Sequence, residues 1–154
     1  MLNADQRLKL LEAPRAMVDL VIDADAYNEI DDQFAIAYAL RSPERLNVRA
    51  IYAAPFLNAR VTAPGEGMEK SYQEILRLLR LAKLTRPVYR GATDYLLDEG
   101  TPSPSDAARD LAARAMDYTP ERPLYVVALG AITNVASALL LNPLMAERVV
   151  VVWL

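Results

Sequence analysis

The chain contains no cysteine and no histidine among its 154 residues. The lack of cysteine excludes disulfide bonds, thiolate catalysis and zinc sites built on thiolates. The lack of histidine removes the side chain that most often acts as an acid or base at neutral pH and most often binds metals. Any chemistry of these residues must therefore use carboxylates and other oxygen donors.

Basic side chains are also in the minority. The sequence has 17 Lys and Arg residues against 20 Asp and Glu residues, which gives a formal net charge of -3. Nucleic-acid binding depends on basic side chains that neutralise phosphates, so we expect no nucleic-acid partner. Charged residues interrupt the first 17 positions, so we expect no signal peptide and a cytoplasmic location.

One uncharged segment, residues 123–146, is long enough to span a bilayer. Gly130 and Pro143 interrupt it, because both residues favour turns over a continuous helix. We therefore expect a buried strand over 124–129, a turn and a short helix over 132–141, and no membrane partner.

Short apolar runs alternate with helical patterns along the rest of the chain. The predicted strands are 17–24, 48–54, 87–89, 124–129 and 149–154. The predicted helices are 31–41, 66–84, 105–118 and 132–141. This alternation predicts an α/β fold with an open, mainly parallel, Rossmann-like sheet and helices on both of its faces.

The two ends of the chain differ in kind. We expect residues 1–16 to form a polar leading segment or short helix, and residues 17–154 to form one α/β domain. The last predicted strand, 149–154, is apolar and lacks the covering helix that usually follows a buried parallel strand. We therefore expect the chain to be the front part of a larger domain and its open edge to favour a homo-oligomer.

Acidic residues gather directly after the first predicted strand, within a stretch that has no Lys or Arg. Within ten residues the sequence places Asp23, Asp25, Glu29, Asp31 and Asp32. In open α/β sheets, ligands bind beyond the carboxyl ends of the strands, which is where this cluster falls. Carboxylates held close together raise one another's pKa values or require a cation. Oxygen donors alone favour a hard ion, Ca²⁺ or Mg²⁺.

A simpler interpretation concerns the helix that follows. Asp31 and Asp32 open it, where negative charge complements the helix dipole by a few tenths to about 1 kcal/mol. This explains those two residues, but it gives no reason for Asp23 and Asp25 at the end of an apolar strand.

Three blocks of sequence are similar to one known family. Residues 21–40, VIDADAYNEIDDQFAIAYAL, resemble the signature of the inosine/uridine-preferring nucleoside hydrolases, in which a strand ends in Asp-x-Asp and an Asp-Asp pair opens the next helix. The likeness continues in residues 51–58, IYAAPFLN, and in residues 126–143, VVALGAITNVASALLLNP. It covers about the front half of the family's domain. The resemblance implies hydrolysis of the N-glycosidic bond of ribonucleosides to ribose and free base.

The resemblance also implies a metal site. Asp25 and Asp32, together with the main-chain carbonyl of Leu129, would bind a catalytic Ca²⁺. Asp31 would be the general base that takes a proton from the water held by the metal. Asp23 would support the loop.

Ribose contacts are implied for a second set of residues. Asn58 would bind a ribose hydroxyl, and the substrate would also contact Asp25. Five residues separate Asp25 from Asp31, where the usual family motif has three, so the longer loop adds Asn28 to the expected substrate contacts.

Two other functions stay open at this point. A haloacid-dehalogenase-type phosphohydrolase also presents Asp-x-Asp at the end of its first strand, and here Thr133 and Lys83 are the candidates for its later Thr and Lys. A non-catalytic remnant that binds a cation or ribose would keep the same acidic cluster without turnover.

Overall fold

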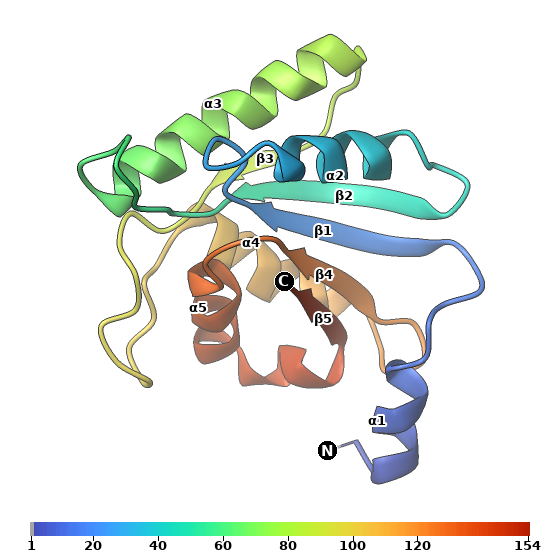
Figure 1. Cartoon of the computed structure of the whole chain (residues 1–154). Helices are drawn as coiled ribbons and strands as arrows, with labels where there is room; N and C mark the ends of the chain where they lie inside the picture. The colour runs from blue at the N-terminus through green and yellow to red at the C-terminus, as the bar shows by residue number, and fades with distance from the viewer. Residues whose placement is uncertain (1) are drawn as a thin grey trace.

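The computed structural model of the protein describes residues 2–154 (Figure 1). Its strands form one all-parallel sheet in the order β3-β2-β1-β4-β5. These strands are β1 (Val18–Ala24), β2 (Leu46–Ala53), β3 (Val88–Arg90), β4 (Leu124–Ala128) and β5 (Val149–Trp153). The predicted α/β sheet is confirmed, with each strand within about two residues of its expected bounds.

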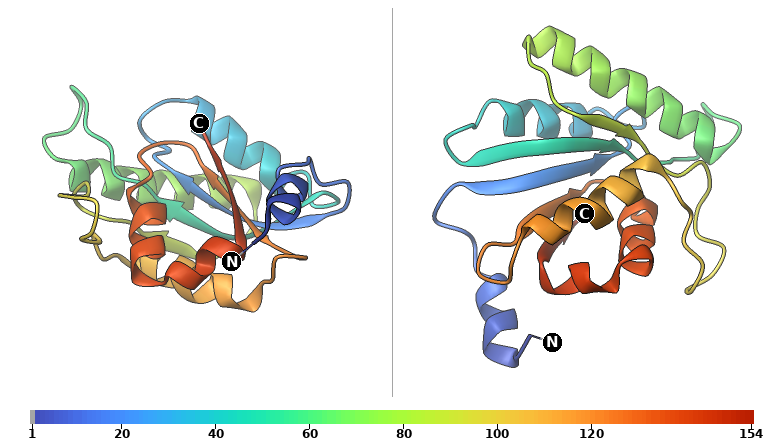
Figure 2. Two further views of the ribbon diagram at one scale, coloured as in Figure 1. Left: turned by 90° about the horizontal axis from the view of Figure 1, so that it is seen from below. Right: turned by 180° about the vertical axis from the view of Figure 1, so that it is seen from behind.

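Helices cover both faces of the sheet, as right-handed crossovers require. In Figure 1, α2 (Asp31–Leu40) and α3 (Pro64–Ala82) lie above the sheet. The helices α4 (Asp106–Arg114) and α5 (Thr133–Leu141) lie below it, and the right-hand view of Figure 2 shows them from behind. The chain turns to the second face after β3, because β4 pairs with the opposite side of β1.

Three short elements complete the fold. They are α1 (Ala4–Leu10) and the 3-10 helices η1 (Ala115–Asp117) and η2 (Pro143–Glu147). Asn3 begins α1 with a capping box, because its side chain accepts from the main-chain N–H of Gln6 and the Gln6 side chain accepts from that of Asn3. None of the helices in residues 2–154 is long and apolar enough to cross a membrane.

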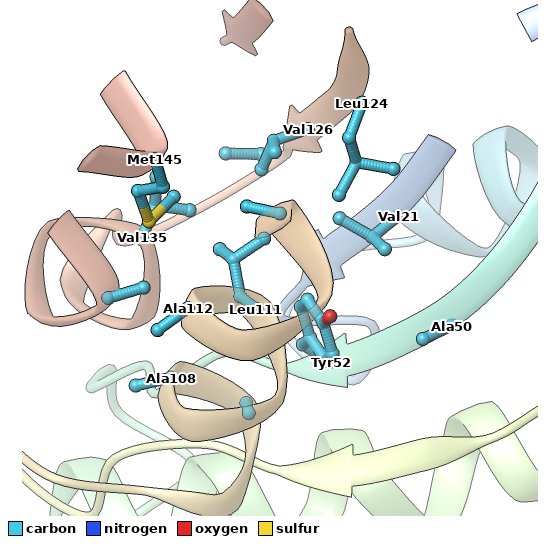
Figure 3. Close-up of a cluster of buried hydrophobic side chains, with 14 of the residues drawn as sticks. Val21, Ala50, Tyr52, Ala108, Leu111, Ala112, Leu124, Val126, Val135 and Met145 are labelled. Carbon is cyan, nitrogen blue, oxygen red and sulfur yellow. The ribbon is translucent and has the colours of Figure 1, made fainter. Parts of the chain in front are cut away.

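The central strand β1 is buried on both faces, which explains its continuous apolar run. Leu20 and Ile22 pack under α2 and α3. Val21 points to the opposite face, into the cluster formed with α4 and α5 (Figure 3). Tyr52 of β2 is fully buried in that second cluster, and its hydroxyl donates to Asp110 Oδ2 at 2.7 Å. The two cores hold β1 in a fixed register, so the residues after it have fixed positions.

Helix boundaries differ from the predicted ones at two places. The helix predicted over 66–84 begins at Pro64 and ends at Ala82, because Lys83 takes a left-handed conformation with φ 57°. The helix predicted over 105–118 leaves the α conformation after Arg114 and continues as η1. Ser105 caps its start, since its hydroxyl accepts from the main-chain N–H of Ala108 at 3.1 Å.

The outer edge of β5 is expected to drive self-association of this chain. In the part of the chain that the structure describes, β5 pairs only with β4, and Val152, Trp153 and Leu154 are 45%, 59% and 87% exposed. An uncharged, exposed edge strand is a template for pairing with another strand. Light scattering over a concentration series should therefore show dimers or larger species. Val152→Lys should shift the chain toward monomer, and a monomeric unsubstituted chain at every concentration would contradict the prediction.

Candidate functional site

The candidate site lies at the carboxyl ends of β1 and β4, where the connections leave the sheet toward opposite faces. β1 pairs with β2 on one side and β4 on the other, and Asp23 is in register with Tyr52 and Ala128. The loop after β1 leads to α2 on one face, while the loop after β4 leads to α5 on the other face (Figure 1). Such a divergence opens a crevice at the carboxyl ends of the strands, where α/β proteins bind their ligands.

Two carboxyl groups meet at this end of the sheet. Asp25 follows β1 and is 7% exposed, while Asp32 in the first turn of α2 is 5% exposed. Burial, together with the adjacent Asp25 carboxyl, raises the pKa of Asp32 to about 8. Burial also raises the pKa of Asp25. The two groups therefore resist carrying two negative charges unless a cation joins them.

The turn after β4 lies against the carboxyl group of Asp25. The main-chain N–H of Leu129 donates to the carbonyl of Asp23 at 2.8 Å, which extends the pairing of β1 and β4 by one residue. A Cβ atom on Gly130 would lie 2.8 Å from Cγ of Asp25, so only glycine lets this turn approach so closely. The indole N–H of Trp153 donates to the carbonyl of Gly130 at 2.9 Å and holds the turn from the β5 side.

The donor chemistry of this arrangement fits a hard cation. Oδ2 of Asp32 is buried and has no hydrogen-bond partner within residues 2–154. A buried carboxylate oxygen without a partner is costly, and a bound cation would remove that cost. Asp25 and Asp32 would supply two carboxylates, although no group of three or more Asp, Glu, His or Cys side chains is placed to hold a metal in the described residues. Main-chain oxygen at Leu129 would be the third donor.

Asp31 occupies a different environment from the buried pair. It is exposed at the start of α2, and its Oδ1 accepts from the main-chain N–H of Asp32 at 3.1 Å. Its negative charge also contributes to the raised pKa of Asp32. The structure thus sets one solvent-accessible carboxylate next to two buried ones.

Two asparagines extend the site toward the loop after β2. Asn28 Nδ2 donates to Asp25 Oδ2 at 3.1 Å, and Asn58 Nδ2 donates to Asn28 Oδ1 at 2.7 Å. Residues from the loops after β1 and β2, far apart in sequence, are therefore connected through their side chains.

Comparison with known proteins gives the family. The sequence model described as inosine-uridine preferring nucleoside hydrolase matches residues 20–154, nearly the whole chain. The chain belongs to this family. The nucleoside hydrolase fold is found again in a purine-preferring ribonucleoside hydrolase from Gardnerella vaginalis, with a TM-score of 0.68 and 22% identity over 88% of this chain. The match covers 48% of that structure, so this chain spans about half its length. No curated protein sequence gives a significant match.

Membership of the nucleoside hydrolase family favours the first of the functions considered above over a haloacid dehalogenase. The position of Lys83 agrees with this. Lys83 lies between the end of α3 and the start of β3, which is the amino end of the parallel strands, whereas Asp25 follows the carboxyl end of β1.

One buried amide near the candidate site was not among the residues predicted from the sequence. Asn134 is fully buried at the start of α5. Its Nδ2 donates to Asp23 Oδ1 at 2.8 Å and to the carbonyl of Ala53 at 3.2 Å. Its Oδ1 accepts from the main-chain N–H of Ala92 at 2.8 Å and from Ser105 Oγ at 3.2 Å. One amide thus joins the ends of β1 and β2 to the loop after β3 and to the start of α4.

The backbone at Gly91 passes so close to this amide that no side chain fits at that position. A Cβ on Gly91 would lie 2.5 Å from Asn134 Nδ2 and 2.0 Å from the carbonyl of Ala53. Burial raises the pKa of Asp23 to about 7 despite its hydrogen bond from Asn134. The only sequence signal for Asn134 was a polar residue inside a long uncharged segment, which does not reveal its four partners.

Asn134→Ala is expected to lower the free energy of unfolding by about 2–6 kcal/mol. The substitution leaves the Asp23 carboxyl and the Ala92 N–H without a partner in the interior, and each such loss costs about 1–3 kcal/mol. Urea unfolding followed by circular dichroism measures the change. Asn142→Ala is the matched control, because Asn142 donates one hydrogen bond from a half-buried position, to Ala112 at 3.2 Å. Equal decreases in the free energy of unfolding would show that the four Asn134 hydrogen bonds stabilise the fold no more than the one hydrogen bond of Asn142.

Proposed function

We propose that this chain hydrolyses the N-glycosidic bond of ribonucleosides to ribose and free base, with Ca²⁺ bound at Asp25 and Asp32. The observation that carries the proposal is the grouping of these two buried carboxyls with the exposed carboxylate of Asp31 at the switch point of the sheet. Family membership supports the reaction class. The similar purine-preferring hydrolase supports a ribonucleoside as the substrate.

The reaction needs two different carboxylate environments. Cleavage of a glycosidic bond passes through a sugar with oxocarbenium character, attacked by water on one face. Asp31 suits the proton transfer, because an exposed carboxylate is free to accept a proton from that water. Asp25 and Asp32 suit cation binding, because they are buried and adjacent, and Oδ2 of Asp32 has no hydrogen-bond partner within residues 2–154.

When bound, Ca²⁺ would supply the positive charge that orients the water and the ribose hydroxyls. The chain's own residues would set the sugar's position around it. Asn58 keeps one Nδ2 hydrogen after its bond to Asn28, and that hydrogen is available for a ribose hydroxyl. Asp23 would support the loop without contacting the substrate, because its side chain is buried and accepts a hydrogen bond from Asn134.

Ca²⁺ is expected to raise the melting temperature of the chain, and Asp25→Ala and Asp32→Ala should each abolish the rise. A ligand present at 100 times its Kd stabilises the folded state by about 2.7 kcal/mol. Thermal melting with and without millimolar Ca²⁺ measures this. Asp106→Ala is the control, because Asp106 is an exposed acid in the first turn of α4 and its loss changes the net charge equally. An identical melting temperature with and without Ca²⁺ in the unsubstituted chain would contradict the metal assignment.

Release of ribose from inosine or uridine tests the reaction itself. The proposal expects turnover that depends on added Ca²⁺. A chain that binds Ca²⁺ but releases no ribose would instead be the non-catalytic remnant considered above.

A further inference from the structure

We propose that Asn28 is a positioning residue that couples the metal carboxylate Asp25 to the sugar-binding residue Asn58. The inference rests on the proposed function, because it assigns a role within that site. It also changes the expected role of Asn28, which sequence analysis grouped with the substrate contacts.

Every polar atom of Asn28 bonds to another residue of the chain. Its main-chain N–H donates to the carbonyl of Asp25 at 2.6 Å, and its own carbonyl accepts from the guanidinium of Arg60. Its Nδ2 donates to Asp25 Oδ2 at 3.1 Å, and its Oδ1 accepts from Asn58 Nδ2 at 2.7 Å. A side chain engaged in this way acts on a substrate through its neighbours.

The direction of these hydrogen bonds is fixed at both ends of the series. At one end, the ionised Asp25 carboxylate can only accept, so Asn28 must turn its NH₂ toward it. At the other end, the main-chain N–H of Arg60 can only donate, and it donates to Asn58 Oδ1 at 2.7 Å. Asn58 must therefore turn its NH₂ toward Asn28, whose remaining acceptor is Oδ1. Neither amide can flip without breaking two hydrogen bonds.

This arrangement makes the two binding events depend on each other. A cation that binds Asp25 would fix the position of its carboxylate, and Asn28, which donates to Oδ2 of that carboxylate, would in turn hold Asn58 in place for the sugar. If the bound cation favours the ordered position of Asn58 by some factor, linkage requires that the ordered Asn58 favours cation binding by the same factor. Removal of the Asn58 side chain must therefore weaken cation binding. The five-residue spacing between Asp25 and Asp31 is what supplies the linking residue.

A double-mutant cycle with the metal alone as the probe tests this coupling. The Kd for Ca²⁺ is measured by calorimetry for the unsubstituted chain, Asn28→Ala, Asn58→Ala and the double variant. We expect Asn58→Ala to weaken Ca²⁺ binding about threefold or more, although Asn58 does not contact Asp25. In the Asn28→Ala background the same substitution should have no further effect. Asn47→Ala is the control and should keep the original Kd, because Asn47 pairs with Asp19 at the other end of the sheet.

Thermal melting shows whether each variant is folded, and Asn58→Leu, with a side chain of similar volume, replaces Asn58→Ala if that variant does not fold. An unchanged Kd for Ca²⁺ in Asn58→Ala overturns the proposal. It is also overturned if the change in Kd of the double variant equals the product of the changes in the two single variants. A chain that releases ribose from inosine but shows either result keeps the proposed function and loses only the coupling. A chain that shows the coupling but releases no ribose loses the proposed function and keeps the role of Asn28.

Discussion

Asp31→Asn is expected to slow ribose release from inosine on the order of 100-fold to 10,000-fold, the range that general-base catalysis contributes. The amide keeps the size of the carboxylate and loses its affinity for a proton. Its Oδ1 can still accept from the main-chain N–H of Asp32, so the start of α2 should remain intact. The effect should therefore fall on the chemical step and not on the fold.

Measurement of Ca²⁺ affinity in the same variant separates the base from the metal ligands. We expect the Kd of Asp31→Asn to stay within about tenfold of the original, because Asp31 is exposed and the proposed ligands are the buried Asp25 and Asp32. Glu29→Gln is the matched control, since it removes an exposed acid from the same loop. Parallel loss of Ca²⁺ binding and activity would make Asp31 a metal ligand, and full activity would remove it from the mechanism.

The fold was predictable because its signals are local. Five apolar runs separated by helical patterns permit few topologies once crossovers are right-handed, and the strand order β3-β2-β1-β4-β5 is one of them. Ser105 carries a capping signal that depends only on residues three positions apart. No comparable sequence signal marks the end of α3. The left-handed backbone conformation of Lys83 that ends this helix depends on the chain that follows it.

The candidate site was predictable only in part. Asp25, Asp31 and Asp32 stand close together in sequence, so their meeting at the end of β1 could be expected. The contact of Asn28 with Asn58 joins residues 30 positions apart and depends on the conformation of two loops. Loop conformation follows from hydrogen bonds among the loops themselves, which periodicity does not report.

The metal-free chain is expected to lose stability as the pH rises from about 4 to about 8, by on the order of a few kcal/mol. Burial raises the pKa of Asp23 to about 7 and that of Asp32 to about 8. Unfolded aspartates have pKa values of about 3.9, so between these limits the folded chain binds more protons than the unfolded one. The free energy of unfolding therefore falls with increasing pH across this window and levels off above it.

Other carboxylates act in the opposite direction but outside that window. Hydrogen bonds from Lys70 and Thr62 lower the pKa of the exposed Glu66 to about 2, so its contribution is complete by about pH 5. Urea unfolding at pH 5 and at pH 8 isolates the buried aspartates. Asp23→Asn should reduce the difference, because the neutral amide needs no proton at either pH.

Ca²⁺ should reverse this dependence, since a divalent cation favours the ionised forms that burial opposes. At pH 8 the Asp32 carboxyl is far more ionised than at pH 5, so Ca²⁺ meets less proton competition there. At pH 5 the same cation must displace a proton from the pair, so the rise in melting temperature should be smaller. Stability in the absence of metal that is equal at pH 5 and pH 8 would show that these carboxyls are ionised at both values. A proton would then not account for the unpartnered Oδ2 of Asp32.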